Sequence, residues 1–484
     1  MDEKTGLLER PLRTRNGRLY LAVFSAVLGN FNFGFSLVYP SPVIPQLLVI
    51  DDPRLRLDTE QVAQFGSIFT LGAAAGGIGA MLLNDLIGRK ISIMASAVPS
   101  TVGYLLMGSA QAVWMLHLGR FLTGIAGGMT AASIPVYISE ISHPSVRGTL
   151  GSCPQITAVF GSLALYALGL VLPWRWLAVV GEVPALLMLF LLCFMPSSPR
   201  YLVTNGHRER ARRALEWLRG PDSDYRRELQ AIETGIATQG KVTWAELTTP
   251  FYYKPILISV VMRFLQQLMG ITPILVYLEP IFQRTNISLA PKYDAVMVGA
   301  VRLLSVALAA SLMDKAGRKI LLYTSGFLMF ISTLSITIYS HTTPCPNPNI
   351  TEYIATNYIS QNAPAFNPVT LIPLISFMLF IFGYAMGWGP ITWLLMSEIL
   401  PLGARGVASG LCVGVSWLTA YGLTHGFIDV VDRYGLFVPF LFFCVVCVVN
   451  ILFTAVVVPE TRNRSLEEIE NYFRTGRTFT IIEG

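Results

Sequence analysis

DLIGRK at residues 85–90 and DKAGRK at residues 314–319 are two copies of one pattern, Asp-x-x-Gly-Arg-Lys, one in each half of the chain. Each copy lies in a short polar gap between two long apolar runs. A second pattern also recurs, with Ser-Glu followed by Arg-Gly at residues 139–148 and again at residues 397–406. Two charged patterns in the same order in both halves indicate a duplicated helical bundle.

The composition indicates that this bundle lies in a membrane. Of 484 residues, 53% are apolar and 13% are charged, whereas a soluble domain has about 25% charged residues. The formal net charge is +6, but Lys and Arg gather in alternate polar gaps, and this distribution marks those gaps as cytoplasmic. It argues against a nucleic-acid partner and for a lipid environment. Duplicated membrane bundles are typical of transporters, with the substrate site between the halves.

Twelve apolar stretches are long enough to cross a membrane as helices. They are residues 19–40, 62–83, 91–110, 113–135, 149–172, 177–195, 255–279, 293–313, 320–340, 371–394, 404–427 and 436–458. The sequence therefore predicts an all-α membrane protein with twelve transmembrane helices in two six-helix repeats. An even number of spans puts both termini on one side. The basic N-terminal segment has no signal-peptide pattern and makes that side cytoplasmic.

The polar segments divide the chain into five parts. These are a cytoplasmic tail (1–18), an N-terminal six-helix bundle (19–196), a cytoplasmic helical linker (197–254), a C-terminal six-helix bundle (255–458) and a second cytoplasmic tail (459–484). In the linker, the pattern predicts an amphipathic helix over residues 208–219 that Gly220 ends. In the tenth span, Gly389-Pro390 between two Trp residues predicts a helix break at a cavity.

The repeated charges predict a network at the cytoplasmic ends of the helices. Its members are Asp85, Arg89, Glu140 and Arg147 in the first half, and Asp314, Arg318, Glu398 and Arg405 in the second. Ion pairs across helices and between halves that form only when the cytoplasmic side is closed would stabilise that conformation. The alternative is that these charges only set the topology through the positive-inside rule.

Charges within the spans are few and informative. Arg120, Arg263 and Arg302 lie inside spans, where a charge is costly and usually faces a cavity or a partner. We expect Arg263 to extend to the cytoplasmic interface, whereas Arg302 is in mid-span. Asp and Glu are missing from the middle of the spans, with Glu182 and Glu279 placed near the non-basic ends. Proton coupling needs an intramembrane carboxylate, so this pattern favours uncoupled, facilitated transport.

The sequence offers no pattern for an enzyme, a metal or a cofactor. The six Cys residues are scattered, and Cys444-x-x-Cys447 reads as two small apolar residues of a membrane helix. A nucleophile with its base, a metal-ligand cluster and a phosphate-binding loop are all missing from the pattern. We therefore expect neither catalysis nor a cofactor.

Five short motifs resemble those of the sugar porters of the major facilitator superfamily. They are Gly119-Arg120, PSSPR at residues 196–200, Gln266-Gln267-Leu268, Gly389-Pro390-x-x-Trp393 and PETR at residues 459–462. Residues 266–277 and 387–393 are most similar to class III of the facilitative glucose transporters of solute carrier family 2. The resemblance implies hexose contacts at Gln155, Gln266, Gln267 and Trp393, and an aromatic residue near the outer gate at Tyr277. Interhelical hydrogen bonding is the alternative role for Gln266 and Gln267.

The chain also departs from the family pattern. Thr272 stands where sugar porters usually have Asn, and Arg302 aligns with another common Asn. Ala385 and Ala420 replace further polar residues, and Ser36 replaces the Asp of proton-coupled relatives. Ser197 replaces the acid of the motif after span six, so the cytoplasmic network loses one carboxylate. We therefore expect weak hexose affinity or a different ligand.

Sorting and modification signals fit class III. Glu3, Leu7 and Leu8 form an acidic dileucine motif for a clathrin-type sorting adaptor, which predicts an endosomal or lysosomal membrane, with the plasma membrane as the alternative. Asn349 is a glycosylation sequon in the long non-cytoplasmic loop, and Asn286 is a second sequon on the same side. The sequon at Asn463 is cytoplasmic and is not expected to be used.

Three functions remain open at this point. The first is facilitative transport of a hexose, with glucose favoured, in an intracellular membrane. The second is transport of another small solute, such as an organic acid or a polyol, with Arg302 binding an anionic group. The third is a non-transporting sugar sensor, which the short C-terminal tail disfavours.

Overall fold

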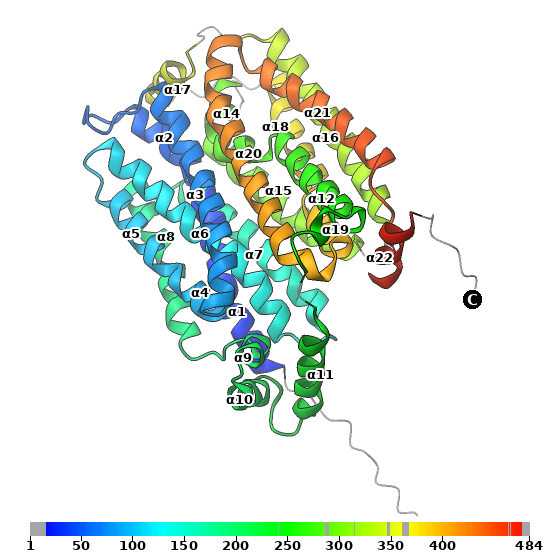
Figure 1. Ribbon diagram of the computed structural model, residues 1–484. Helices are drawn as coiled ribbons and strands as arrows, with labels where there is room; N and C mark the ends of the chain where they lie inside the picture. Colours follow the sequence, from blue (N-terminus) through cyan, green and yellow to red (C-terminus); the bar gives the residue numbers. More distant parts are fainter. Residues whose placement is uncertain are drawn as a thin grey trace, which may run out of the picture.

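Long apolar helices that run between two polar ends make up the structure, which is a computed structural model (Figure 1). It describes residues 16–240, 242–285, 290–313, 315–345, 349–360, 367–462, 464 and 466–476. Within these ranges, eleven helical segments are long and apolar enough to cross a membrane. A twelfth helix, α7 (Arg147–Leu168), completes the expected set, although its Gly, Ser, Thr and Gln residues make it more polar.

Six membrane-length segments form each half. The N-terminal half contains α1 (Gly17–Leu37) continued by α2 (Pro40–Leu48), α3 (Thr59–Leu86), α4 (Arg89–Ala95) continued by α5 (Ala97–Gly108), α6 (Val113–Ile141), α7 and α8 (Trp174–Leu192). The C-terminal half contains α12 (Pro250–Leu268) continued by α13 (Ile271–Val276) and α14 (Leu278–Arg284), α15 (Pro291–Leu312), α16 (Arg318–Thr342), α18 (Ile372–Met386) continued by α19 (Pro390–Ile399), α20 (Arg405–Tyr434) and α21 (Phe437–Val456). The fold is thus the twelve-helix membrane bundle that the sequence predicts.

The two ends of the bundle carry different short helices (Figure 1). One end, called here the linker end, carries α9 (Pro199–Thr204), α10 (Arg208–Arg219), α11 (Tyr225–Thr238) and α22 (Leu466–Thr475). The opposite end, called the α17 end, carries α2 and α17 (Ile350–Ser360). Three single turns, η1 (Glu246–Thr248), η2 (Pro368–Leu371) and η3 (Leu402–Ala404), precede α12, α18 and α20. By the distribution of basic residues, the linker end is the expected cytoplasmic side.

The linker helix α10 has the predicted bounds. Its apolar face, which includes Leu215 and Leu218, is buried, and Gly220 ends it with a φ of 91°. Arg219 is 2% exposed, pairs with Glu228 at 2.8 Å and donates to the carbonyl of Ile141 at 2.9 Å. These contacts hold the linker against the end of α6.

Two of the spans in the C-terminal half are interrupted. The predicted break in span ten is confirmed, because α18 ends at Met386 and α19 begins at Pro390. A break in span seven, which the sequence analysis did not predict, follows α12 at Gly270. This residue has a φ of +87°, which only glycine adopts without strain, and an added Cβ would lie 2.4 Å from the ring of Phe443.

The two halves meet along two helix pairs, α3 with α20 and α7 with α15. The α17 helix, which the sequence analysis did not predict, packs against α2 of one half and α14 of the other. The α22 helix packs against α12 and α19 at the linker end. The halves therefore share a long interface that α17 spans at one end.

Candidate functional site

Hydrogen bonds between the halves gather toward the α17 end. The hydroxyl of Tyr277 in the loop before α14 donates to the carbonyl of Ala63 in α3 at 3.3 Å. The hydroxyl of Tyr166 in α7 donates to the carbonyl of Leu275 at 2.8 Å. Tyr277 is fully buried and its ring stacks on Phe427 at 5.8 Å. These contacts hold the halves together at the α17 end, where the resemblance placed an aromatic gate residue.

Gln266 and Gln267 lie at the end of α12, just before the break in span seven. The Gln266 amide nitrogen donates to the hydroxyl of Tyr384 at 2.9 Å and to the carbonyl of Trp388 at 2.7 Å. The Gln267 amide nitrogen donates to Ser416 at 3.0 Å. Both Gln side chains are buried. In this conformation they tie α12 to the broken span ten and to α20.

Arg263 does not extend to the interface, and that expectation was wrong. Its side chain is 2% exposed and donates to Gln266, to Ser416 at 3.0 Å and to Thr392 at 3.5 Å. The reason is the start of the helix: α12 begins at Pro250, so Arg263 lies about 20 Å along it, beyond the reach of its side chain to the interface. The sequence identified Arg263 as a charge within a span but not as a member of this central group, because the predicted span begins later than α12 does.

Trp393 in α19 faces the same group of side chains. The guanidinium carbon of Arg263 lies 3.8 Å from the centroid of its ring, a cation–π contact. Trp393 itself is 41% exposed, so part of the indole ring is free to contact a ligand. The structure therefore brings Trp393, Gln266, Gln267 and Arg263 together.

Thr272 and Gln155 have different surroundings. The Thr272 hydroxyl donates to the Gln267 side-chain oxygen at 3.0 Å, so it belongs to the central group. Gln155 is exposed in α7, about two turns before Ser162 and on the same face of the helix. Ser162 contacts Gly34 of α1 as well as Arg302 of α15, and no described hydrogen bond joins the Gln155 side chain to the central group.

Arg302 in α15 reaches across to the N-terminal half. Its guanidinium lies 3.4 Å from the hydroxyl of Ser162 in α7. The α15 helix that carries Arg302 packs against α18, whose Tyr384 accepts from Gln266 at 2.9 Å. Arg302 thus lies beside the central group at the interface between the halves.

The predicted charged residues pair within each half at the linker end. Arg89 lies 3.1 Å from Glu140, and Arg318 lies 3.1 Å from Glu398. Each carboxylate also accepts a hydrogen bond from a hydroxyl in the segment that follows its half. Ser198 donates to Glu140 in the first half, and Thr461 donates to Glu398 in the second. The duplication seen in the sequence is therefore a duplication of contacts.

The remaining members of the predicted network have other contacts. Asp85 lies 3.8 Å from Arg89 and is exposed, and Asp314 lies outside the described residues. Arg147 donates to the carbonyl of Ser142 at 3.3 Å, and Arg405 donates to that of Ser397 at 2.9 Å. Both arginines thus hold the turn that leads into their own helix.

The second copy of the network contains an acid that the first copy lacks. Glu460 accepts from the backbone N–H groups of Arg318 and Lys319, each at 3.1 Å, at the start of α16. Ser197 holds the matching place in the first half, and the hydrogen bonds described for the start of α4, which follows Gly88, include none from a backbone N–H to a carboxylate. The missing carboxylate is therefore a missing helix cap.

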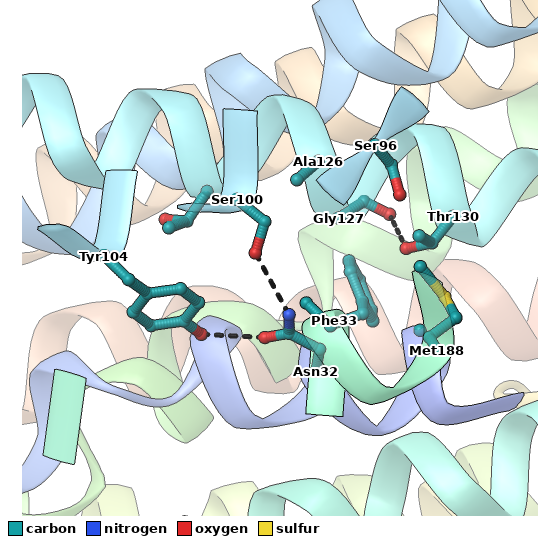
Figure 2. Close-up of a pocket in the computed structure, with 12 residues that line it drawn as sticks. Asn32, Phe33, Ser96, Ser100, Tyr104, Ala126, Gly127, Thr130 and Met188 are labelled. Carbon is teal, nitrogen blue, oxygen red and sulfur yellow. Dashed lines mark hydrogen bonds between the residues drawn. The ribbon is translucent and has the colours of Figure 1, made fainter. Parts of the chain in front are cut away.

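A carboxylate does lie in the middle of a span, contrary to expectation. Glu182 is near the centre of α8, is 8% exposed and accepts from Ser100 at 2.9 Å and from Thr101. The expectation failed because α8 begins earlier than predicted. The Ser100 hydroxyl also accepts from the amide nitrogen of Asn32, and the Tyr104 hydroxyl donates to the side-chain oxygen of Asn32. These three side chains line a small pocket inside the N-terminal half (Figure 2). Because this carboxylate lies within a span, the pattern of acidic residues no longer favours uncoupled transport.

The predicted signals at the surface are only partly described. Asn349 is exposed at the start of α17, and its side-chain oxygen accepts from the backbone of Thr351 at 3.1 Å. The dileucine residues Glu3, Leu7 and Leu8, and the sequon at Asn286, lie outside the described residues. Within the described ranges, His, Cys, Asp and Glu form no group of three that could hold a metal ion.

Comparison with known proteins identifies close relatives. The family model described as "Sugar (and other) transporter" matches residues 22–473. The chain is 59% identical over 474 residues to the mouse solute carrier family 2, facilitated glucose transporter member 6, covering 98% of this chain and 94% of that protein. It is 41% identical to mouse member 8 of the same family, with 97% and 98% covered.

Solved structures support the fold. An inward open conformation of the xylose transporter XylE from E. coli matches with a TM-score of 0.75 at 24% identity, covering 94% of this chain and 99% of that chain. A partially occluded inward open conformation of the same transporter matches with a TM-score of 0.74. The bundle therefore has the major facilitator fold.

Proposed function

Because this chain belongs to the sugar (and other) transporter family, we propose that it is a facilitative hexose transporter working by alternating access. The observation that carries the proposal is the central group of Gln266, Gln267 and Trp393, which α12, α19 and α20 bring together in the C-terminal half. Amide side chains donate to and accept from sugar hydroxyls, and an indole ring packs against the C–H face of a sugar. The relatives named as facilitated glucose transporters make glucose the first substrate to test.

The contacts between the halves support alternating access. Hydrogen bonds cross the interface toward the α17 end, whereas the described ion pairs of Arg89 and Arg318 stay within their own halves. This is the arrangement expected of a state that opens toward the linker end. In the opposite state, the charges at the linker end would come together as a gate and the Tyr277 contacts would separate.

Counterflow of labelled glucose into proteoliposomes tests the function. We expect saturable flux that an imposed proton gradient leaves unchanged. The absence of saturable flux would remove the transport proposal. A gradient-dependent rate that disappears in Glu182→Gln would replace uniport with proton coupling, because Glu182 is a buried carboxylate within a span.

We further propose that the linker end and both termini are cytoplasmic and that the protein resides in an endosomal or lysosomal membrane. The dileucine motif at Glu3, Leu7 and Leu8 supports recognition by a clathrin-type adaptor. Replacing Leu7 and Leu8 with Ala should move a tagged protein to the plasma membrane, and an unchanged distribution would contradict this. Asn349 at the opposite end is the proposed glycan site, and its replacement by Gln should abolish the mobility shift on enzymatic deglycosylation.

A further inference from the structure

Two guanidinium groups lie at the central site without an acidic partner. The described ion pairs of the chain include neither Arg263 nor Arg302. The partners of Arg263 are the amide of Gln266, two hydroxyl groups and the ring of Trp393. Arg302 contacts the hydroxyl of Ser162. All of these partners are neutral, so the centre of the molecule carries uncompensated positive charge.

The two arginines have different access to a ligand. Arg263 is 2% exposed, and its two terminal nitrogens already donate to protein groups. It therefore acts on a ligand mainly through its charge. Arg302 is partly exposed, and its recorded hydrogen bond is the long contact to Ser162. Its guanidinium is thus the group that can make a direct contact, on a helix that packs against α18.

A buried charge without a counter-ion is costly, and a membrane interior raises that cost. An arginine that served only to hold α7 against α15 would gain little over a neutral donor, since Ser162 requires only one hydrogen bond. A guanidinium at the substrate site has a specific use in binding carboxylate or phosphate oxygens with two parallel hydrogen bonds. The uncompensated charge points to a ligand that brings the negative charge with it.

We propose that the central site preferentially takes a hexose that carries an anionic group, with Arg302 contacting the anion and Gln266, Gln267 and Trp393 contacting the sugar. The shared chemistry is a sugar ring with a carboxylate or a phosphate. This inference rests on the proposed transport function and names the substrate class of the same site.

The first experiment is competition against counterflow of labelled glucose in proteoliposomes at fixed ionic strength. The competitors are glucuronate, glucose 6-phosphate, unlabelled glucose and inorganic phosphate. We expect one of the anionic sugars to compete at a concentration about tenfold lower than glucose, as a charge-assisted contact allows. Which of them does so separates a carboxylate from a phosphate ligand. Equal competition by glucose and both anionic sugars would overturn the inference, as would inorganic phosphate competing as well as glucose 6-phosphate.

Variants of Arg302 separate a ligand contact from a structural role. Arg302→Gln should lower the preference for the anionic sugar over glucose about tenfold, whereas Arg302→Lys, which keeps the charge, should retain most of it. Arg54→Gln, in an exposed pair with Asp52 at the α17 end, is the control for loss of one positive charge. An unchanged preference in Arg302→Gln would overturn the proposal.

Thermal stabilisation of the purified full-length protein gives a readout that does not need flux. The anionic sugar should raise the melting temperature of the original protein more than glucose does, and the difference should vanish in Arg302→Gln. This result would support the inference even if glucose flux were absent. Absence of glucose flux would remove only the proposed hexose transport. Glucose flux without any preference for the anionic sugars would remove only the further inference.

Discussion

Both polar atoms of the Gln267 side chain already have a partner within the protein. Its nitrogen donates to Ser416 and its oxygen accepts from Thr272, both at 3.0 Å. Thr272 therefore uses its hydroxyl in a hydrogen bond within the protein, whereas an Asn at this position could make a hydrogen bond to a sugar. A ligand that takes over either of these two hydrogen bonds exchanges with a protein hydroxyl, which reduces the net gain from that contact.

Replacing Gln267 with Ala should raise the half-saturation concentration for hexose about tenfold, because it removes an amide and leaves two hydroxyls without their partner, at about 1–2 kcal/mol. Counterflow at a series of glucose concentrations measures this effect. Gln230→Ala, on the exposed linker helix α11, is the matched control and should behave as the original protein does. A change smaller than about twofold in Gln267→Ala would show that Gln267 is only an interhelical tie.

At the scale of residues, the sequence identified Gln266, Gln267, Trp393 and the charge of Arg302, but not that Arg263 lies among them. Gln266, Gln267 and Trp393 were found from motif resemblance, and the structure brings them together. Arg263 and Glu182 were misplaced because both judgements depended on where a helix begins. Helix starts are set by caps and packing at the membrane surface, which hydropathy does not resolve.

The two copies of the linker-end network differ as elements. Glu460 caps the start of α16 by accepting two backbone N–H groups, whereas α4 follows Gly88, which has no side chain to cap it. A carboxylate at a helix N-terminus satisfies free donors and interacts favourably with the helix dipole. The first half is therefore the less firmly held of the two at this end.

Ser197→Glu should restore the missing cap and stabilise the protein by about 0.5–2 kcal/mol. Ser197 is partly exposed and lies beside Ser198, which already contacts Glu140, so a longer side chain has room. The melting temperature of the purified protein measures the effect. Glu460→Ser is the reciprocal change and should lower it, and a fall in the Ser197→Glu variant would contradict the comparison of the two halves.

At the scale of elements, hydropathy and turn residues predicted the twelve spans, the linker helix α10 and the break in span ten. They missed the continuation of the first span by α2, the helix α17 and the break at Gly270. That break depends on the ring of Phe443 from α21, which leaves no room for a Cβ. Likewise α17 is held by α2 and α14, and such tertiary contacts leave no periodic signal in the local sequence.

In the whole molecule, the ion pairs of each half stiffen that half as one body. Arg318 and Glu398 are 14% and 16% exposed and join α16 to α19. Each six-helix body can then move against the other along α3 with α20 and α7 with α15. The sequence predicted these charges but not their pairing, because two copies of the same motif allow pairing within or between halves.

Glu398→Gln should destabilise the protein by about 2 kcal/mol, since it leaves the largely buried Arg318 without its counter-ion; the full cost for a buried pair is about 3–5 kcal/mol, reduced here by partial exposure. The double variant with Arg318→Gln should recover part of this loss. Asp429→Asn breaks the exposed pair with Arg433, whose side chains are 58% and 67% exposed, and should change stability by less than about 0.5 kcal/mol. Equal effects of Glu398→Gln and Asp429→Asn on the melting temperature would contradict this account.

The amide of Gln266 connects the ligand site to the break between α18 and α19, because it donates to the carbonyl of Trp388 within that break. A ligand oxygen that accepts from this nitrogen competes with the backbone of the break for the same donor. Ligand binding at the site and bending of span ten are then coupled equilibria. By thermodynamic reciprocity, if the ligand shifts the equilibrium toward the loosened break by a given factor, the protein with the loosened break binds the ligand more tightly by the same factor.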